Sequence, residues 1–493
     1  MPGKYKPQRY PATPKLNGRH RQIASRFTYG ITQPVVASVK QAGGGLPWAR
    51  QQIAHAYSDV AGDLAKSDWW PSQHDDAQQV WKNQTSGMRG SWEVMWDYSR
   101  RLMIRRMLSE NQLLEIMTEF WEGHLHVACN SDPQSFWRVS YGDVIRKHAL
   151  GRFDEMLKEA ALHPAMLLYL DAGVSTKAHP NENLGRELLE LHTVGVGHYT
   201  EDDVKNASRI LTGYKIDMWN TWAFKYSPDD HWTGAVQVGD FSDPNSNADG
   251  QQVALDMIHY LAHRPETAQR IALKLCYKFV GDDPSDELVN TLAQTYLAND
   301  TDIVPVILRL LRSREFNRSR DNKLRDPAED LVAAWRAIGA TMAAPSTDAD
   351  AANDMIWQVG AIGLMPMAWP TPDGQPLTNG AWASPRRAMA SMQSHWNLAG
   401  GWWPTSGVTY KPRASWAPEP SDAVEGPITF GQLVDHMARL VHGKPSTQSV
   451  LKACSKAAQV PPDEKITTGH RAVGSRLPYV LATLLDHPTF YSR

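Results

Sequence analysis

The chain has 493 residues, enough for two or three ordinary domains or for one large helical body with insertions. A formal charge of −2 argues against binding to nucleic acid or to an anionic membrane, and three scattered cysteines argue against a disulfide framework or a cysteine-rich zinc site. No segment has the apolar length of a signal peptide or of a membrane span, so we expect a cytoplasmic protein.

The predicted elements are nearly all helices. Apolar periodicity predicts two consecutive helices over 91–127, joined near Glu110, and the second ends near Gly123. Further helices are predicted over 153–162, 164–171, 181–194, 201–212, 251–262, 265–280, 286–297, 303–313, 327–343, 356–367, 382–398, 430–441, 449–459 and 477–485.

Two segments interrupt this pattern. Residues 214–250 are rich in aromatic residues, Asp and Gly, and their short alternating runs predict an irregular insertion that contains a small β-hairpin. Residues 344–351 contain few large apolar side chains and are the best candidate for a linker. We therefore expect a mainly α protein with a main helical body at 1–343 and a C-terminal helical portion at 352–493 that packs on it.

The predicted helix 181–194 has the most informative pattern. At about 100° per residue, its polar side chains gather on one arc and its leucines, together with His192, on the other. Arg186 lies one turn from Glu182 and from Glu190, and Glu187 lies three residues from Glu190. A salt-bridged surface face is one interpretation; the like-charged pair Glu187/Glu190 and a histidine on the apolar side favour a functional site.

The sequence also resembles a known family. The run Asn181 to Thr193, with Tyr199-Thr200 and Leu211-Thr212-Gly213 behind it, is similar to the bacterial family called domain of unknown function 1800. The resemblance extends from about Leu16 to about Ala399, and the similar positions include Trp121, His124, Arg146, His148, Tyr169, Asp171 and Lys274.

This resemblance implies little about activity. Many members look secreted and travel with a second exported protein, which implies a possible protein partner for this chain. Three positions depart from the family pattern: Trp232 follows His231 where Asp is usual, Tyr214 replaces Trp, and Gly197-His198 replaces a glycine pair.

The first functional hypothesis is a hydrolase, most plausibly one that cleaves glycosidic bonds in a saccharide. Glu187 would donate the proton, because its like-charged neighbour Glu190 raises its pKa, while Glu190 stays ionised beside Arg186. Because two carboxylates on one helix are usually too close for an inverting pair, Asp230 from the insertion is a candidate partner, with Glu182 as a further catalytic candidate. The remaining candidates would bind substrate: Arg186, His124, Arg146, His148, His192, His231, Trp121, Trp222 and Lys274.

Two other hypotheses stay open. Histidines 124, 148, 192 and 231 could bind zinc or iron together with Glu187 or Glu190, although His192 and Glu190 are predicted on different arcs. Alternatively the arginine, glutamate and histidine residues form a structural network in a helical scaffold without activity. The hydrolase hypothesis requires no cofactor, and we assign no metal ligand.

Overall fold

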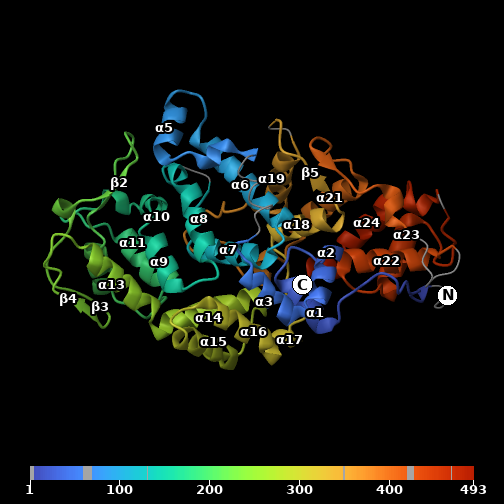
Figure 1. The fold of residues 1–493 in the computed structure, drawn as a ribbon, viewed down its shortest axis with the longest axis horizontal. Coiled ribbons are helices and arrows are strands. Elements are labelled where there is room, and N and C mark those ends of the chain that lie inside the picture. Colours follow the sequence, from blue (N-terminus) through green and yellow to red (C-terminus); the bar gives the residue numbers. More distant parts are fainter. Residues whose placement is uncertain (1–4, 59–68, 130–131, 348–349, 419–426, 468) are drawn as a thin grey trace.

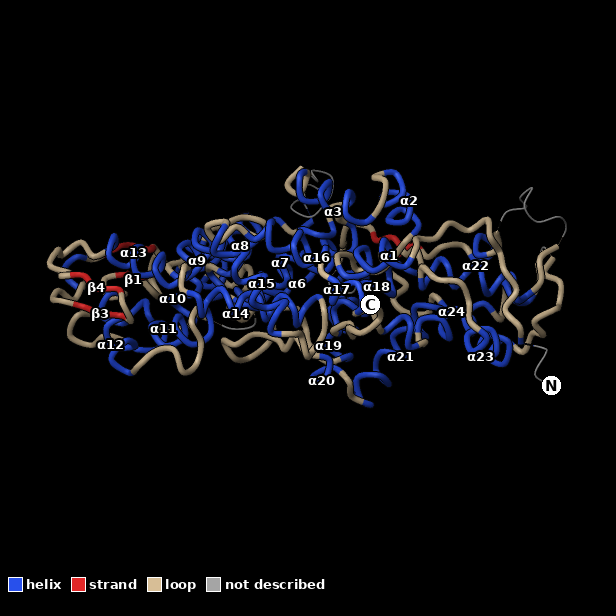
Figure 2. The backbone as a smooth tube through the Cα atoms, turned by 90° about the horizontal axis from the view of Figure 1, so that it is seen from below, coloured by secondary structure: helices blue, strands red, loops and turns tan. Residues whose placement is uncertain are grey.

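The computed structural model describes residues 5–58, 69–129, 132–347, 350–418, 427–467 and 469–493. Over these ranges the protein is 58% helical, and its strands form three small two-stranded sheets, which confirms the predicted mainly α fold with small hairpin insertions. The molecule is elongated, with two of the sheets at one end and helices α22 (Phe430–His442), α23 (Gln448–Ala458) and α24 (Leu477–Leu485) at the other (Figures 1 and 2).

The first half of the chain is helical, and α6, α7, α9, α10 and α12 begin and end close to their predicted bounds. In chain order they are α1 (Gly18–Arg26), α2 (Gln33–Gln41), α3 (Gly45–Ala54), α5 (Ala77–Thr85), α6 (Ser91–Leu108), α7 (Gln112–His124), α8 (Arg138–His148), α9 (Phe153–Ala161), α10 (Pro164–Tyr169), α11 (Glu182–Glu187) and α12 (Glu201–Ile210). Helix α12 begins with a capping box: Asp203 N–H donates to Thr200 Oγ1, and Thr200 N–H donates to Asp203 Oδ2.

The second half continues with helices. They are α13 (Gln251–Ala262), α14 (Pro265–Phe279), α15 (Asp286–Ala298), α16 (Ile303–Arg312), α17 (Arg314–Arg318), α18 (Pro327–Ala337), α19 (Ala351–Ile362), α20 (Asn379–Trp382) and α21 (Pro385–Gly400), followed by α22 to α24 and by α25 (Pro488–Tyr491). The helix predicted over 327–343 ends early, because Thr341–Met342 (β5) pairs with Val408–Thr409 (β6).

Helix α7 lies in the middle of the molecule (Figure 1) and is buried on nearly every side. Its apolar residues occupy one arc of the helix, and Leu113, Ile116 and Trp121 have no exposed surface. The opposite arc is also buried, because its three glutamates pair with cations of other segments. It packs against α8 and α3, and its last turn, at Gly123 and His124, opens onto the candidate site described below.

The irregular insertion contains two hairpins in place of the single predicted one. Tyr214–Ile216 (β1) pairs with Phe224–Tyr226 (β2), and Val236–Val238 (β3) pairs with Phe241–Asp243 (β4), both antiparallel. The two alternating runs identified in the sequence therefore belong to different hairpins, each of which pairs with its nearest neighbour in the chain. In the second hairpin Gly239, with φ of +56°, provides the tight turn.

The stretch predicted as one helix over 181–194 divides into two parts. Helix α11 ends at Glu187, and Leu188–His192 forms a π-helical segment. Thr193 Oγ1 donates to Leu188 O (2.6 Å), and Gly195 N–H donates to Leu189 O (2.9 Å), so the last turn is wider than an α-turn. The extra residue in the turn changes the direction of every side chain after Glu187.

Helices from both sides of the proposed linker share one core. Helix α18 packs against α19 and α21, and buried apolar residues from both sides belong to one continuous cluster. The linker itself, 344–351, lies partly outside the described residues, so the boundaries at 343 and 352 stay a prediction. A search of the described helices finds none with the length and apolar character needed to cross a membrane.

Candidate functional site

A pocket with a volume of about 370 Å³ lies where the end of α7, the middle of α14 and the segment 369–377 meet. Its wall combines apolar side chains with both positive and negative groups. The polar residues on the wall are His124, Arg270, Lys274, Tyr277, Asp373 and Gln375. Two residues predicted to bind substrate, His124 and Lys274, are therefore neighbours on one wall.

The amine of Lys274 lies against an imidazole and has no carboxylate partner among the described residues. Its Nζ lies 3.0 Å from His124 Nδ1. Burial and the nearby cation of Arg270 lower the pKa of Lys274 to about 7, against a smaller opposing effect of Asp373. At neutral pH this lysine is therefore present in both the charged and the neutral form, and the neutral amine is a base and a nucleophile.

His124 and His192 hold each other through reciprocal hydrogen bonds. His124 Nε2 donates to His192 O and His192 Nδ1 donates to His124 O, both at 3.1 Å. Because carbonyl oxygens only accept, His124 must carry its proton on Nε2, which leaves Nδ1 free to accept from Lys274. Burial lowers the pKa of His192 to about 3 and that of His124 well below its usual value, so both rings are neutral. His192 thus positions His124, and His124 positions the amine.

Arg270 connects the pocket to the π-helical segment. Its Nε donates to Leu191 O (3.0 Å), one of the carbonyls that a helix end leaves without a partner. Its terminal nitrogens make no hydrogen bond or ion pair with a described residue. The guanidinium lies against Gly195, whose φ is +90°: a Cβ added there would lie 2.9 Å from Nη1. The cation is therefore fixed at one end and free to bind at the other.

Asp373 is the carboxylate of the pocket, and it lies on an anchored segment. Trp369 Nε1 (3.1 Å) and the Thr371 hydroxyl both donate to Asp373 Oδ1. The segment is tied down through its backbone, because His126 Nε2 lies 2.8 Å from Trp369 O. Gly374, with φ of +72°, passes so close to α7 that an added Cβ would lie 1.9 Å from a backbone oxygen, so this position requires glycine.

Glu187 lies beside this segment but not on the pocket wall. It is half-buried and has no hydrogen bond or ion pair among the described residues. Burial, Glu190 and Asp373 raise its pKa, and Arg186 only partly opposes them. Burial, Asp373 and Glu187 together raise the pKa of Tyr169 to about 12. The Tyr169 hydroxyl donates a hydrogen bond to the backbone of the same segment. Glu187 is therefore a carboxyl group that holds its proton more readily than usual.

The predicted cluster of three carboxylates around Arg186 does not form. Arg186 pairs with Glu182 (3.3 Å) and with Glu201 (2.7 Å), a residue of α12 that sequence analysis did not consider. Because the π-helical segment turns Glu190 away, it accepts a hydrogen bond from the Tyr199 hydroxyl instead. Arg186 and Glu182 are partly exposed and Glu201 is exposed, so this part of α11 is a solvated ion-paired surface.

The other charged candidates lie away from the pocket. Arg146 pairs with Glu115 (2.9 Å), and His148 Nε2 lies 3.0 Å from Glu159. Asp230 in the insertion lies 3.8 Å from the amine of Lys215.

His231 is also occupied within the insertion. Its Nδ1 lies 3.1 Å from Thr212 O and its Nε2 lies 2.9 Å from Asn245 Oδ1. Both ring nitrogens are therefore used to hold the insertion together, which leaves neither for the predicted contact with substrate.

The tryptophans predicted to bind sugar are core residues. Trp121 stacks on Phe153 with ring centroids 5.3 Å apart, and its indole donates to Ala149 O. Trp222 is fully buried and stacks on Phe136 at 4.0 Å. Neither of these two tryptophans lines the pocket.

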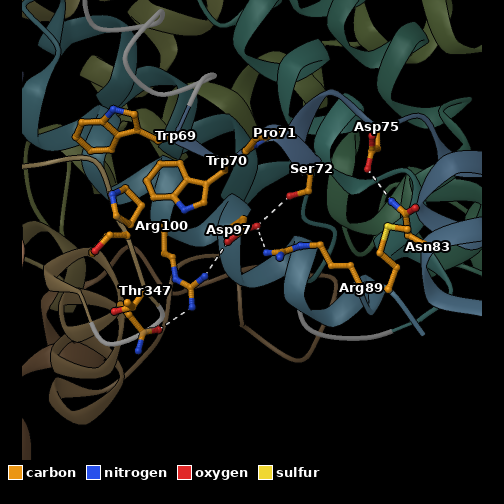
Figure 3. Close-up of a pocket in the computed structure, with 15 residues that line it drawn as sticks. Trp69, Trp70, Pro71, Ser72, Asp75, Asn83, Arg89, Asp97, Arg100 and Thr347 are labelled. Atoms are coloured by element: carbon orange, nitrogen blue, oxygen red, sulfur yellow. Dashed lines mark hydrogen bonds and ion pairs between the residues drawn. The ribbon is translucent and has the colours of Figure 1, made fainter. Parts of the chain in front are cut away.

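Tryptophans do line a different pocket, of about 620 Å³, at Trp69 and Trp70. Figure 3 shows its charged groups directed at one another: Arg89 and Arg100 both point to Asp97. Arg100 Nη1 lies 2.7 Å from Asp97 Oδ1, and Arg89 forms an ion pair with Oδ2. Its charged groups are thus already engaged with one another, in contrast to Lys274 and Arg270.

The described residues contain two groups that could bring three metal-ligating atoms together, and neither includes the histidines predicted for this role. One consists of Asp154, His259 and His263, the other of Glu119, Asp326 and Glu329. Protein cations already pair with these carboxylates: Lys158 with Asp154, and Lys278 with Glu119 and Glu329. The metal hypothesis for His124, His148, His192 and His231 stays untested.

Sequence analysis missed Arg270, Asp373 and Gln375. Arg270 precedes Lys274 by one helical turn, so the predicted helix 265–280 already carried the signal of two cations on one face. Asp373 occurs in a Pro- and Gly-rich connection about a hundred residues later, where no periodicity places a side chain. No local pattern could have found it.

Comparison with known proteins gives one match. Residues 22–492 match the family described as Protein of unknown function (DUF1800). Among curated proteins and among solved structures there is no match.

Proposed function

Because the chain belongs to the DUF1800 family, whose description assigns no activity, we propose a function from the site itself: a hydrolase that cleaves a glycosidic bond by acid–base catalysis. The observation that carries this proposal is Glu187. It is a half-buried carboxyl group without a partner, its pKa is raised, and it lies close enough to the carboxylate of Asp373 for the two to affect each other. Two carboxyl groups in different environments are the requirement for this chemistry.

In this mechanism Glu187 is the acid and Asp373 is the base. Glu187 donates its proton to the oxygen of the leaving sugar, and Asp373 removes a proton from the water that attacks the anomeric carbon. One C–O bond breaks, one forms, and the two carboxyl groups exchange protonation states. Asp373 replaces Asp230 as the second carboxylate, and its fixed Oδ1 leaves Oδ2 as the atom available to water.

The pocket supplies the substrate contacts in this proposal. His124 and Lys274 keep their predicted binding role, and Arg270 joins them. A volume of about 370 Å³ is at the lower end of the range for small-molecule sites, so we propose that the pocket takes one end of a saccharide while the rest extends outside. A protein partner also remains a proposal.

The alternative of a scaffold without activity predicted a fully paired network with no adjoining cleft. A buried ion-paired network exists around Lys278, which pairs with Glu119 and Glu329. Glu187 and Asp373 are not part of it. We therefore favour the hydrolase.

The test measures release of reducing ends from a panel of neutral and acidic polysaccharides. For a polysaccharide that the wild type cleaves, we expect Glu187→Gln to lower the cleavage rate by roughly 10²- to 10⁴-fold, as for loss of a general acid. The matched control is Glu182→Gln on the same helix: it removes a glutamate that only pairs with partly exposed Arg186, and it should leave the rate within about twofold.

Glu187→Gln should also melt at the wild-type temperature, because the side chain has no partner to lose. The proposal fails if no polysaccharide is cleaved by the wild type, or if Glu187→Gln and wild type cleave at equal rates.

A further inference from the structure

The pocket holds more positive charge than its own residues neutralise. Lys274 lies against a neutral histidine, and the terminal nitrogens of Arg270 make no hydrogen bond or ion pair with a described residue. The carboxylate of Asp373 accepts its hydrogen bonds from neutral donors, Trp369 and Thr371. Buried or partly buried cations are normally paired, so two unpaired cations on one pocket wall need a further explanation.

We infer that Arg270 and Lys274 form a subsite for a carboxylate of the substrate, so that the saccharide is an acidic one built from uronic acid units. The part of this inference that the substrate is a saccharide rests on the proposed function. The part that it carries a carboxylate rests on the pocket alone. The planar fork of an arginine matches the two oxygens of a carboxylate, and the lysine adds a point charge beside it.

The charge balance favours a monoanion. With Lys274 protonated, the pocket wall contains two positive groups and the one negative group of Asp373, which leaves a net charge of +1 on the wall. Glu190 acts on Arg270 from outside the wall but forms no ion pair with it. A carboxylate neutralises this charge, whereas a phosphate dianion would leave an excess of negative charge in a partly buried site. The chemistry of the wall therefore points to a uronate over a sugar phosphate.

The fold fixes the arginine for this role. Nε of Arg270 is held by Leu191 O at the end of the π-helical segment, and the guanidinium lies against Gly195, where no side chain interferes. Only the outer edge of the fork remains for a ligand. A cation that is immobilised before binding loses less conformational freedom when the ligand arrives.

Binding should be coupled to uptake of a proton. The groups that face the Lys274 amine are neutral His124 from α7, with His192 behind it, and on the pocket wall Arg270 and Tyr277 from α14 and Asp373 from the 369–377 segment. The charge of the Lys274 amine changes near neutral pH, because its pKa is lowered to about 7. A carboxylate that binds beside the amine favours its charged form, so at pH 7 roughly half a proton should be taken up per ligand.

The experiment is isothermal titration calorimetry on the full chain with three probes: sodium D-glucuronate, D-glucose and inorganic phosphate. We expect glucuronate to bind at least roughly tenfold more tightly than glucose, which has the same ring without the carboxylate, and more tightly than phosphate. Repeating the titration in buffers of different ionisation enthalpy measures the proton uptake.

Three variants locate the binding site. Arg270→Met and Lys274→Met should each weaken glucuronate binding at least roughly tenfold, and Lys274→Met should also abolish proton uptake. Arg264→Met is the matched control, because Arg264 precedes the same helix but pairs with Asp240 and Glu266 outside the pocket. If Arg270→Met does not fold after losing its contact to Leu191 O, glucuronate binding by Lys274→Met still tests the inference.

The outcomes separate this inference from the proposed function. Any of four results overturns the inference: equal binding of glucose and glucuronate, tighter binding of phosphate than of glucuronate, no binding of glucuronate, or unchanged glucuronate binding in Lys274→Met. Cleavage of a neutral polysaccharide without glucuronate binding leaves the hydrolase standing and removes the uronate subsite. Glucuronate binding with no hydrolysis of any polysaccharide leaves the subsite standing and removes the hydrolase.

Discussion

Lys274 and Lys278 lie one turn apart on α14, and both amines are sheltered from water, yet their surroundings differ completely. Lys278 lies 2.6 Å from Glu119 and 2.8 Å from Glu329. Burial opposes its charge, but these carboxylates outweigh burial and raise the pKa of Lys278. Lys274 has only a neutral imidazole and a neighbouring arginine, and its pKa falls to about 7. Burial alone does not make an amine reactive; the charge of its partners decides.

The region around Lys278 is a closed network. Arg106 lies 3.3 Å from Glu119, and Arg493, the last residue of the chain, pairs with Glu329. The side chains of this network are almost completely buried, and they come from α6, α7, α14, α18 and the C-terminus. It therefore joins distant parts of the chain and has the character expected of a structural network, whereas the Lys274 pocket leaves its cations unpaired.

The largest effect expected from this comparison is the loss of Lys278. Lys278→Met leaves Glu119 and Glu329 with one cation each, and it should lower the free energy of unfolding by about 3 kcal/mol, the lower end for a broken buried ion pair because Arg106 and Arg493 remain. Urea denaturation at pH 7 measures this loss.

Two companion variants make the result specific to charge. Lys274→Met on the next turn should cause no loss at pH 7, because it removes a cation that has no carboxylate partner. Adding Glu329→Gln to Lys278→Met should recover part of the lost stability, because it removes one of the uncompensated charges. Equal destabilisation by the two methionine variants would contradict the comparison.

A smaller effect is expected in the pH dependence of stability. The pKa of Lys274 in the folded protein, about 7, lies below its ordinary value of 10.5, so the unfolded chain binds more protons between these values. Folding is therefore disfavoured by the lysine at low pH, and the wild type gains stability as pH rises. Relative to Lys274→Met it should gain about 2 kcal/mol between pH 7 and pH 9.

The pKa shift of Lys278 has the opposite sign, so Lys278 adds no pH dependence of stability between pH 7 and pH 9. Its pKa is raised, so its contribution is fully present below the unfolded value and is lost only at higher pH. Urea denaturation measures the stability of wild type and Lys274→Met at both pH values. In the difference between the two proteins, the contributions of the titratable groups that they share cancel. A constant difference between them would show that Lys274 titrates normally.

The sequence was sufficient to predict the helical fold and part of the site. His124 and Lys274 were predicted to bind substrate as positions of the family resemblance, and the structure makes each the partner of the other, although they lie 150 residues apart in the chain. Glu187 was expected to hold its proton because of Glu190, and Glu190 is one of the groups that raise its pKa. Only the second of these inferences used a neighbour within one helical turn.

What could not be predicted depends on contacts between distant residues. The π-helical segment is held by His124 and Arg270, which bind the carbonyls of His192 and Leu191 from 68 and 79 residues away. Helical periodicity assumes a constant turn, so it assigned Glu190 to Arg186 and not to Tyr199. Asp373 belongs to a segment without periodicity, and contacts from His126, Tyr169 and the Gly123 backbone hold that segment at the site.

The smallest effect concerns Arg186, whose spacing from Glu182 and Glu190 left two interpretations open, a salt-bridged surface face and a functional site. In the structure its partner Glu182 is partly exposed and its partner Glu201 is exposed, and water screens such pairs. Arg186→Met should therefore shift the thermal midpoint by about 1 °C or less at ordinary salt, and 0.5 M sodium chloride should leave the difference between variant and wild type no larger. A large loss of stability would mean that Arg186 holds Glu190 and Glu187 in solution, as the unbroken helix predicts, and would move the site from the Lys274 pocket to the polar face of α11.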